Sequence, residues 1–161
     1  MPPTTAAYIA LGANLGDREQ NLRVALDLLN ATPGVRVTRV SSFLETPAVG
    51  GPAGSPPFLN ATAELEATLD PRALLDRLLE IERELGRERR EKWGPRRIDL
   101  DLLLYADRVI DEPDLKLPHP LMHKRRFVLQ PLAEIAPEAA HPVLGMPIDA
   151  LLRRLEAREG H

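Results

Sequence analysis

The chain has 161 residues, 43% of them hydrophobic and 28% charged, which is the length and composition of one globular domain. Its formal net charge of −3 argues against a protein that coats nucleic acid non-specifically, and the absence of cysteine excludes disulfides and thiolate chemistry. The first residues lack the charged and apolar regions of a secretory signal, and no apolar stretch is long enough to span a membrane, so we expect a cytoplasmic protein with no membrane or nucleic-acid partner.

The first part of the chain predicts a strand, a helix and a second strand. Residues 6–11 are a short apolar run that predicts a buried strand. Asp17, followed three residues later by Gln20, forms a plausible capping box, and apolar residues at helical spacing follow it. Alternating residues then predict a second strand over 35–43.

The middle of the chain predicts a functional loop, a strand and a helix. Residues 46–57 are dense in glycine and proline and have no periodicity, and so long an irregular segment in a compact domain is usually functional. Alternation over 58–66 predicts the third strand. Asp70-Pro71 is a strong helix start, and the helical spacing of apolar residues continues to Gly86.

The last part of the chain predicts a fourth strand over 98–105 and two shorter helices over 127–135 and 148–156. The order is therefore βαββαβ with a helical tail. This order predicts one α+β domain over residues 1–161 with a ferredoxin-like core. The tail is placed to cover the second face of the sheet, which would make an α/β/α sandwich.

The fourth strand contains two aspartates, Asp99 and Asp101, two residues apart. Successive side chains of a strand alternate between its faces, so the two carboxylates would share one face. Gathering them there is costly unless a cation lies between them, and an all-oxygen site favours Mg²⁺. The alternative is an ordinary solvent-facing strand of alternating polarity. The leucines that follow and the basic loop that precedes favour a functional pair.

The loop before this strand is rich in positive charge. Its basic residues are Arg87, Arg89, Arg90, Lys92, Arg96 and Arg97. A solvated surface loop is the usual fate of such a run, but Trp93 and Gly94-Pro95 within it favour ligand binding and movement. The chain has no Walker-type or dinucleotide glycine motif, so arginine and metal would have to hold any phosphates.

Other candidate residues are less decisive on the residues alone. Glu82 is best interpreted as a surface residue of its helix, and Phe58 and Phe127 as core. Asn60 lies within the third strand, where asparagine is disfavoured, so a ligand contact is a fair interpretation. His119 is more often structural than catalytic, although its basic neighbourhood would suit a phosphate contact.

Several motifs, spread over most of the chain, match one enzyme family in order and approximate spacing. They are Ala7-Tyr8-Ile9-Ala10-Leu11-Gly12-Ala13-Asn14-Leu15-Gly16, Ser41-Ser42-Phe43-x-x-Thr46-Pro47, Phe58-Leu59-Asn60, Trp93-Gly94-Pro95-Arg96-x-Ile98-Asp99-Leu100-Asp101, Pro118-His119-Pro120 and Phe127-Val128-Leu129-Gln130-Pro131-Leu132. With them the chain resembles the 6-hydroxymethyl-7,8-dihydropterin pyrophosphokinases of folate biosynthesis.

The resemblance implies a reaction in which Mg²⁺-ATP gives its terminal pyrophosphoryl group to the hydroxymethyl oxygen of the pterin, and AMP leaves. It implies that Asp99 and Asp101 hold two Mg²⁺ ions and that Arg87 and Arg96 act with them in catalysis. The residues it implies for ATP binding are Glu82, Arg89, Lys92, Trp93, Ile98, Lys116, His119 and Arg125.

For the pterin, the resemblance implies a place between the rings of Phe58 and Phe127, which replaces their interpretation as core. Asn60 and the segment containing Thr46, Pro47 and Val49 would read the polar edge of the pterin. We expect the chain to act as a monomer.

Two alternatives remain open at this stage. An RNA-binding module shares the βαββαβ order, but Asp99 and Asp101 would repel phosphate in the absence of metal. A Mg²⁺-dependent nucleotidyl transferase would share the paired aspartates and would release pyrophosphate in place of AMP.

Overall fold

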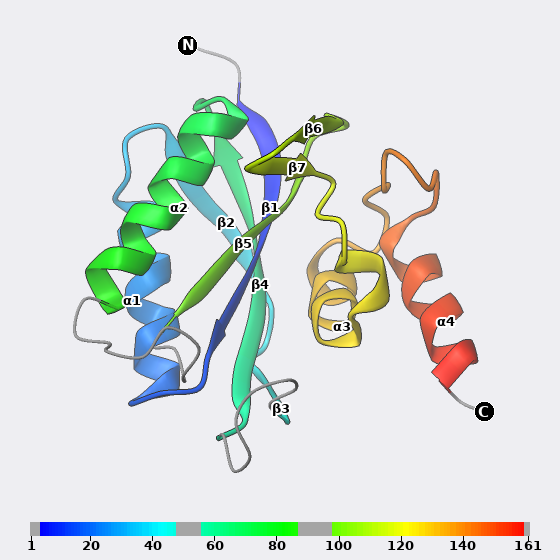
Figure 1. Ribbon diagram of the computed structural model, residues 1–161, viewed down its shortest axis with the longest axis horizontal. Helices are drawn as coiled ribbons and strands as arrows, with labels where there is room; N and C mark the ends of the chain where they lie inside the picture. Colours follow the sequence, from blue (N-terminus) through cyan, green and yellow to red (C-terminus); the bar gives the residue numbers. More distant parts are fainter. Residues whose placement is uncertain (1–3, 48–55, 87–97, 160–161) are drawn as a thin grey trace.

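A single antiparallel sheet lies at the centre of the computed structural model, which describes residues 4–47, 56–86 and 98–159 (Figure 1). Its strands are β1 (Thr5–Ala13), β2 (Val35–Val40), β3 (Leu44–Thr46), β4 (Phe58–Ala67) and β5 (Asp99–Tyr105). The strand order is β2-β4-β1-β5, with β3 paired to β4, and every neighbouring pair is antiparallel. This is the predicted split-βαβ, ferredoxin-like topology.

Helices cover both faces of the sheet (Figure 1). One face carries α1 (Arg18–Asn30) and α2 (Pro71–Gly86). The other carries α3 (Arg126–Ile135), and α4 (Ile148–Glu159) packs on α3 from outside. A hydrophobic cluster fills each of the two layers, because each sheet face must bury its apolar side chains against a helix. The predicted α/β/α sandwich is confirmed.

The helix starts follow the predicted capping residues. The carboxylate of Asp17 accepts a hydrogen bond from the backbone N–H of Gln20 at 3.1 Å, and that of Asp70 accepts one from the N–H of Ala73 at 2.8 Å. Each bond satisfies a backbone donor that the first turn of a helix leaves unpaired. The two caps therefore fix the residues at which α1 and α2 begin.

The strand β5 keeps the predicted separation of acidic and apolar faces. Leu100 and Leu102 belong to the cluster under α1 and α2, whereas Asp99 and Asp101 are partly exposed and belong to neither cluster. The register of β1 and β5 shifts near Ile9, and after this shift residues 103–104 both enter the cluster under α3.

Four short elements were not predicted from the sequence. They are β3, the hairpin of β6 (Ile110–Glu112) and β7 (Leu115–Leu117), and the 3₁₀ helix η1 (Met122–Lys124). The predicted second strand over 35–43 is wrong beyond Val40, because the hydroxyl of Ser41 accepts the hydrogen bond of Thr62 N–H at 2.9 Å and interrupts the ladder before β3. Three-residue strands are too short to show a period.

No helix within the described residues could cross a membrane.

Candidate active site

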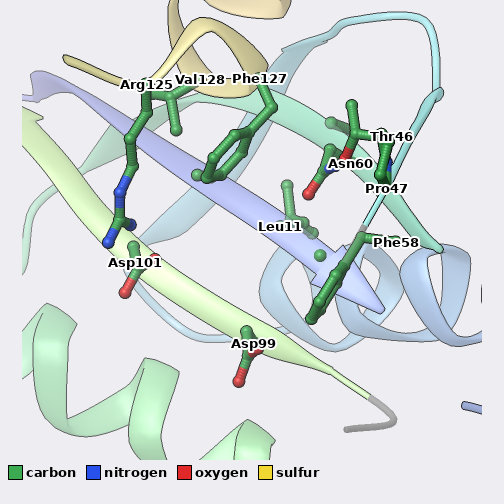
Figure 2. A pocket seen from close by; sticks show the side chains of 13 residues that line it. Leu11, Thr46, Pro47, Phe58, Asn60, Asp99, Asp101, Arg125, Phe127 and Val128 are labelled. Carbon is green, nitrogen blue, oxygen red and sulfur yellow. Dashed lines mark hydrogen bonds between the residues drawn. The ribbon is translucent and has the colours of Figure 1, made fainter. Parts of the chain in front are cut away.

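A cavity of about 310 Å³ lies on the face of the sheet that carries α3 (Figure 2). That size is typical of small-molecule sites. It is lined by residues of β1, β3 and its end, β4, β5 and the start of α3, namely Ala10, Leu11, Gly12, Thr46, Pro47, Phe58, Asn60, Ala61, Asp99, Asp101, Arg125, Phe127 and Val128. The cavity thus unites eight of the residues that the sequence singled out, from segments far apart in the chain.

The acidic wall of the cavity is formed by Asp99 and Asp101. Figure 2 shows both side chains on the same side of β5, as the strand period predicted. The backbone between them is held by α2, because the carboxylate of Glu82 accepts a hydrogen bond from the N–H of Leu100 at 2.7 Å. The interpretation of Glu82 as a simple surface residue is therefore wrong. It is partly buried and braces the strand that presents the two aspartates.

A basic group and an imidazole lie beside this wall. Figure 2 shows the guanidinium group of Arg125 extending towards Asp101, and its Cζ lies 5.6 Å from the ring centroid of Phe127. The Nδ1 atom of His119 accepts a hydrogen bond from the N–H of Leu121 at 3.1 Å, so the neutral ring carries its proton on Nε2. Burial lowers the pKa of His119; the Asp101 carboxylate opposes this shift and Arg125 adds to it.

The aromatic wall is formed by Phe58 from β4 and Phe127 from α3. Both side chains are only partly buried, and both line the cavity. Figure 2 shows the two rings with Leu11 between them in the view. Phe58 belongs to neither hydrophobic cluster, so its interpretation as core is wrong, whereas Phe127 packs against the cluster under α3 and also lines the cavity. The binding of a pterin between the two rings stays a prediction.

A polar corner of the cavity is built around Asn60. Its side chain is 6% exposed, and Nδ2 donates a hydrogen bond to Thr46 Oγ1 at 2.6 Å. Gly12 lies opposite Asn60 in the β1–β4 register. A Cβ atom on Gly12 would lie 3.0 Å from Asn60 Oδ1 and 3.5 Å from Phe58 Cδ1. A side chain at this position would therefore crowd both groups.

Gly12 lines the cavity but was not singled out from the sequence, because the predicted first strand ended at residue 11. The structure places it within β1. The signal was present, since a glycine inside an apolar strand pattern often marks a close approach of another group.

The oxygen donors of the site fit a magnesium ion. Within the described ranges, no three histidine or acidic side chains are grouped as a metal site. Asp99 and Asp101 are the acidic pair of the cavity. Mg²⁺ keeps several water ligands and is often held by one or two carboxylates together with substrate phosphates. A carboxylate pair facing an open cavity matches this mode of binding.

Four of the predicted nucleotide-binding residues are described by the structure but do not line the cavity: Glu82 and His119, whose contacts are given above, and Ile98 and Lys116. Ile98 is 4% exposed and packs in the cluster under α1 and α2. Lys116 is exposed on β7, and its Nζ forms an ion pair with Asp111 at 2.6 Å. Six further predicted residues lie outside the described residues, and their roles stay predictions: Val49, Arg87, Arg89, Lys92, Trp93 and Arg96.

Comparison with known proteins identifies the family of this chain. Residues 8–137 match the model of the family described as 7,8-dihydro-6-hydroxymethylpterin-pyrophosphokinase, HPPK. The chain is 50% identical over 129 residues to the 2-amino-4-hydroxy-6-hydroxymethyldihydropteridine pyrophosphokinase of Bacillus subtilis, covering 80% of this chain and 77% of the relative. It is 43% identical over 150 residues to the protein of the same name from Synechocystis sp., covering 93% and 76%.

Solved structures support the same fold. The crystal structure of wild-type Plasmodium falciparum HPPK-DHPS matches with a TM-score of 0.76 at 17% identity. The match covers 100% of this chain and 43% of the solved chain, so the present chain spans less than half of that protein. At this identity the likeness concerns the fold alone. On the strength of the family model and the curated relatives, the chain belongs to the 7,8-dihydro-6-hydroxymethylpterin-pyrophosphokinase family.

Proposed function

We propose that the cavity beside α3 is the site at which this chain transfers pyrophosphate from ATP to 6-hydroxymethyl-7,8-dihydropterin, a step of folate biosynthesis. Membership of the family makes the chain an ATP-dependent diphosphotransferase. The observation that carries the proposal for the site is that one cavity joins an acidic pair on β5 to two aromatic rings and a buried amide. Those are the groups that a metal-bound polyphosphate and a flat, polar-edged ring would need.

The pterin occupies the aromatic and polar part of the cavity in this proposal. Phe58 and Phe127 contact the faces of the pterin ring, since flat heteroaromatic rings pack well on aromatic side chains. Asn60 reads the polar edge with its amide, which is held in place by Thr46. Pro47 lines the same side. A contact from Val49 stays a prediction from the resemblance.

The triphosphate lies along the acidic wall. Asp99 and Asp101 would hold two Mg²⁺ ions, which would supply positive charge to offset that of the phosphates. Arg125, with a guanidinium group beside Asp101, is placed to bind a phosphate oxygen. His119 can donate the proton on Nε2 to another phosphate oxygen.

The remaining predicted groups complete this arrangement. The proposed catalytic residues Arg87 and Arg96 would neutralise charge on the transferred group. The proposed ATP-binding residues Glu82, Arg89, Lys92, Trp93, Ile98 and Lys116 would act around the nucleotide; of these, Glu82 supports β5 through Leu100.

The reaction needs positioning and charge neutralisation, with no covalent enzyme intermediate. The hydroxymethyl oxygen attacks the β-phosphorus of ATP, the bond from that phosphorus to the α-phosphate oxygen breaks, and AMP leaves. Walls of opposite chemical character in one cavity would bring the alcohol and the polyphosphate together. The main contribution of the chain to the reaction would then be the positioning of the two substrates.

Product identification tests the proposal. The chain is incubated with Mg²⁺-ATP and 6-hydroxymethyl-7,8-dihydropterin, and we expect AMP to form in equal amount with the pterin diphosphate. Release of pyrophosphate would instead support a nucleotidyl transferase. Asp101→Ala should lower turnover to less than about one tenth of wild type while the fold is kept. Asp107→Ala, an exposed aspartate just beyond β5, is the matched control and should leave turnover unchanged.

The RNA-binding alternative is tested by titration with a single-stranded RNA, for which we expect no saturable binding. The sheet face that such a module would use carries Asp99 and Asp101 and is partly covered by α3. A monomeric state and a cytoplasmic location, both expected from the sequence, remain part of the proposal.

A further inference from the structure

A second cavity, of about 160 Å³, lies between η1 and α4, apart from the site described above. Its lining comes from the 3₁₀ turn, from the loop before α4, and from one stripe of α4. None of its lining residues belongs to the cavity beside α3. Figure 1 shows α4 at the outer edge of the molecule, separated from the sheet by α3.

The stripe of α4 that faces this cavity has an unusual composition. Leu151, Arg154, Leu155 and Arg158 follow the spacing i, i+3, i+4, i+7 and so lie on one side of the helix. Such a stripe normally packs with apolar residues at every position. Here Leu151 and Leu155 pack in the hydrophobic cluster under α3, and the other two positions are Arg154 and Arg158, which line the cavity.

The positive charges at this cavity lack acidic partners. Lys124 on η1 also lines it, and neither Lys124 nor Arg158 has an ion-pair partner within 4.0 Å in the described part of the chain. Arg154 donates a hydrogen bond to the thioether sulfur of Met146 at 3.6 Å, which is a weak acceptor. No carboxylate lines the cavity among the described residues.

The acidic residues of α4 are engaged on other sides of the helix. Arg153 pairs with Asp149 at 3.2 Å, and Arg126 of α3 pairs with Glu156 at 3.2 Å and with Glu159 at 4.0 Å. Within the described part of the chain, the acidic residues of α4 therefore pair with Arg153 and Arg126 and not with the arginines that line the cavity.

A histidine at the wall of the cavity reports the same excess of positive charge. The Nδ1 atom of His123 is buried and has no hydrogen-bond partner among the described residues. Burial lowers the pKa of His123, and the charges of Lys124, Arg154 and Arg158 lower it further. Three cations thus act on one small space, and no counter-charge lines it among the residues that the structure describes, which is the electrostatic condition for concentrating an anion.

We propose that the cavity between η1 and α4 binds a phosphate group, either free or as a small monoester, through Lys124, Arg154 and Arg158. Guanidinium groups bind phosphate oxygens with paired, charge-assisted hydrogen bonds, and a lysine adds a point charge. The cavity volume accommodates a phosphate group but is small for a whole nucleotide. Leu144, Leu151 and Leu155 provide an apolar wall against which the carbon skeleton of a monoester would pack. This inference does not depend on the proposed function of the first site.

The test follows the imidazole signals of the full chain by NMR while inorganic phosphate is added at constant ionic strength. We expect the signals of His123 to shift saturably, with a dissociation constant of about 1 mM or below. His119 reports on the cavity beside α3, so binding there is recognised separately. Unchanged His123 signals would overturn the proposal.

Matched variants on α4 establish which charges act. Arg154→Gln combined with Arg158→Gln should weaken the response of His123 at least about tenfold, whereas Arg153→Gln, on the paired side of the same helix, should leave it intact. All three arginines are exposed, so these changes should not unfold the chain. Equal weakening by Arg153→Gln would mean general charge attraction and would overturn the site.

A second titration, with ribose 5-phosphate, identifies the source of the phosphate group. Binding as tight as that of inorganic phosphate, or tighter, would assign the cavity to a monoester that uses the leucine wall. Binding of inorganic phosphate alone would assign it to the free anion. Either result supports the proposal, and failure of both ligands would overturn it.

Discussion

Substitution of Gly12 by alanine tests the polar corner of the cavity beside α3. The added Cβ would lie 3.0 Å from Asn60 Oδ1, so the amide must yield by a few tenths of an ångström. That amide is also held by Thr46 Oγ1 at 2.6 Å, so it cannot move without misaligning the hydrogen bonds it offers to a ligand. One misaligned hydrogen bond is worth about 0.5–1.5 kcal/mol, which corresponds to a KM for the pterin raised about two- to tenfold.

The expected effect on folding is much smaller, because two contributions oppose each other. Alanine restricts the unfolded chain more than glycine does and favours the strand by about 0.5–1 kcal/mol, whereas the close contact with Asn60 costs a similar amount. The free energy of unfolding in urea should therefore change little. The KM for ATP should change less than that for the pterin, because the atoms nearest the added Cβ belong to Asn60, Phe58 and Leu59, whereas Asp99, opposite Gly12 on β5, is not among them.

The assay is a steady-state measurement of AMP release at varied pterin concentration, made on four proteins: wild type, Gly12→Ala, Asn60→Ala and the double variant. If the alanine acts through the Asn60 amide, it should have little further effect once Asn60 has lost that amide. An unchanged pterin KM in Gly12→Ala, or the same increase with and without the Asn60 amide, would show that Gly12 does not act through Asn60.

Three further predictions follow from the same structure. Glu82→Ala should lower the free energy of unfolding in urea by about 1–3 kcal/mol, because it removes the acceptor for Leu100 N–H; Glu82→Gln should cost less, and an equal cost would contradict this role. Phe127→Leu should raise the KM for the pterin about tenfold and that for ATP less, because the Arg125 guanidinium group also lies over the Phe127 ring; equal increases in steady-state kinetics would contradict the assignment. His141 is 4% exposed, and burial lowers its pKa below the ordinary 6.5, so the unfolded chain binds more protons than the folded chain. The free energy of unfolding in urea should therefore fall as the pH falls below about 6.5, and it should fall less in His141→Gln. The same dependence of this free energy on pH in both proteins would contradict the prediction.

The acidic wall was predictable from the sequence because its signal is local. Asp99 and Asp101 lie two residues apart, and the period of a strand places both carboxylates on one face without any knowledge of the rest of the fold. The capping residue Asp17 was predictable for the same reason. Local spacing also sufficed for the order of the main strands and helices, from which the ferredoxin-like topology follows.

The contacts between distant segments were not predictable from residue patterns. Phe58 and Phe127 are 69 positions apart, and phenylalanine is a residue type usually found in the core, so only the resemblance placed the two at a site. The bond from Leu100 N–H to Glu82 joins a strand to a helix and leaves no periodic trace. The excess positive charge of Arg154 and Arg158 on α4 was not predictable either, because it depends on which acidic residues form ion pairs with other arginines.

The most direct test of the central claim is a crystal structure of the chain with Mg²⁺, a non-hydrolysable ATP analogue and the pterin. We expect an ion about 2.1 Å from carboxylate oxygens of both Asp99 and Asp101, with a pterin ring between Phe58 and Phe127. A nucleotide bound with no ion at either carboxylate, or a pterin bound away from both rings, would contradict the central claim.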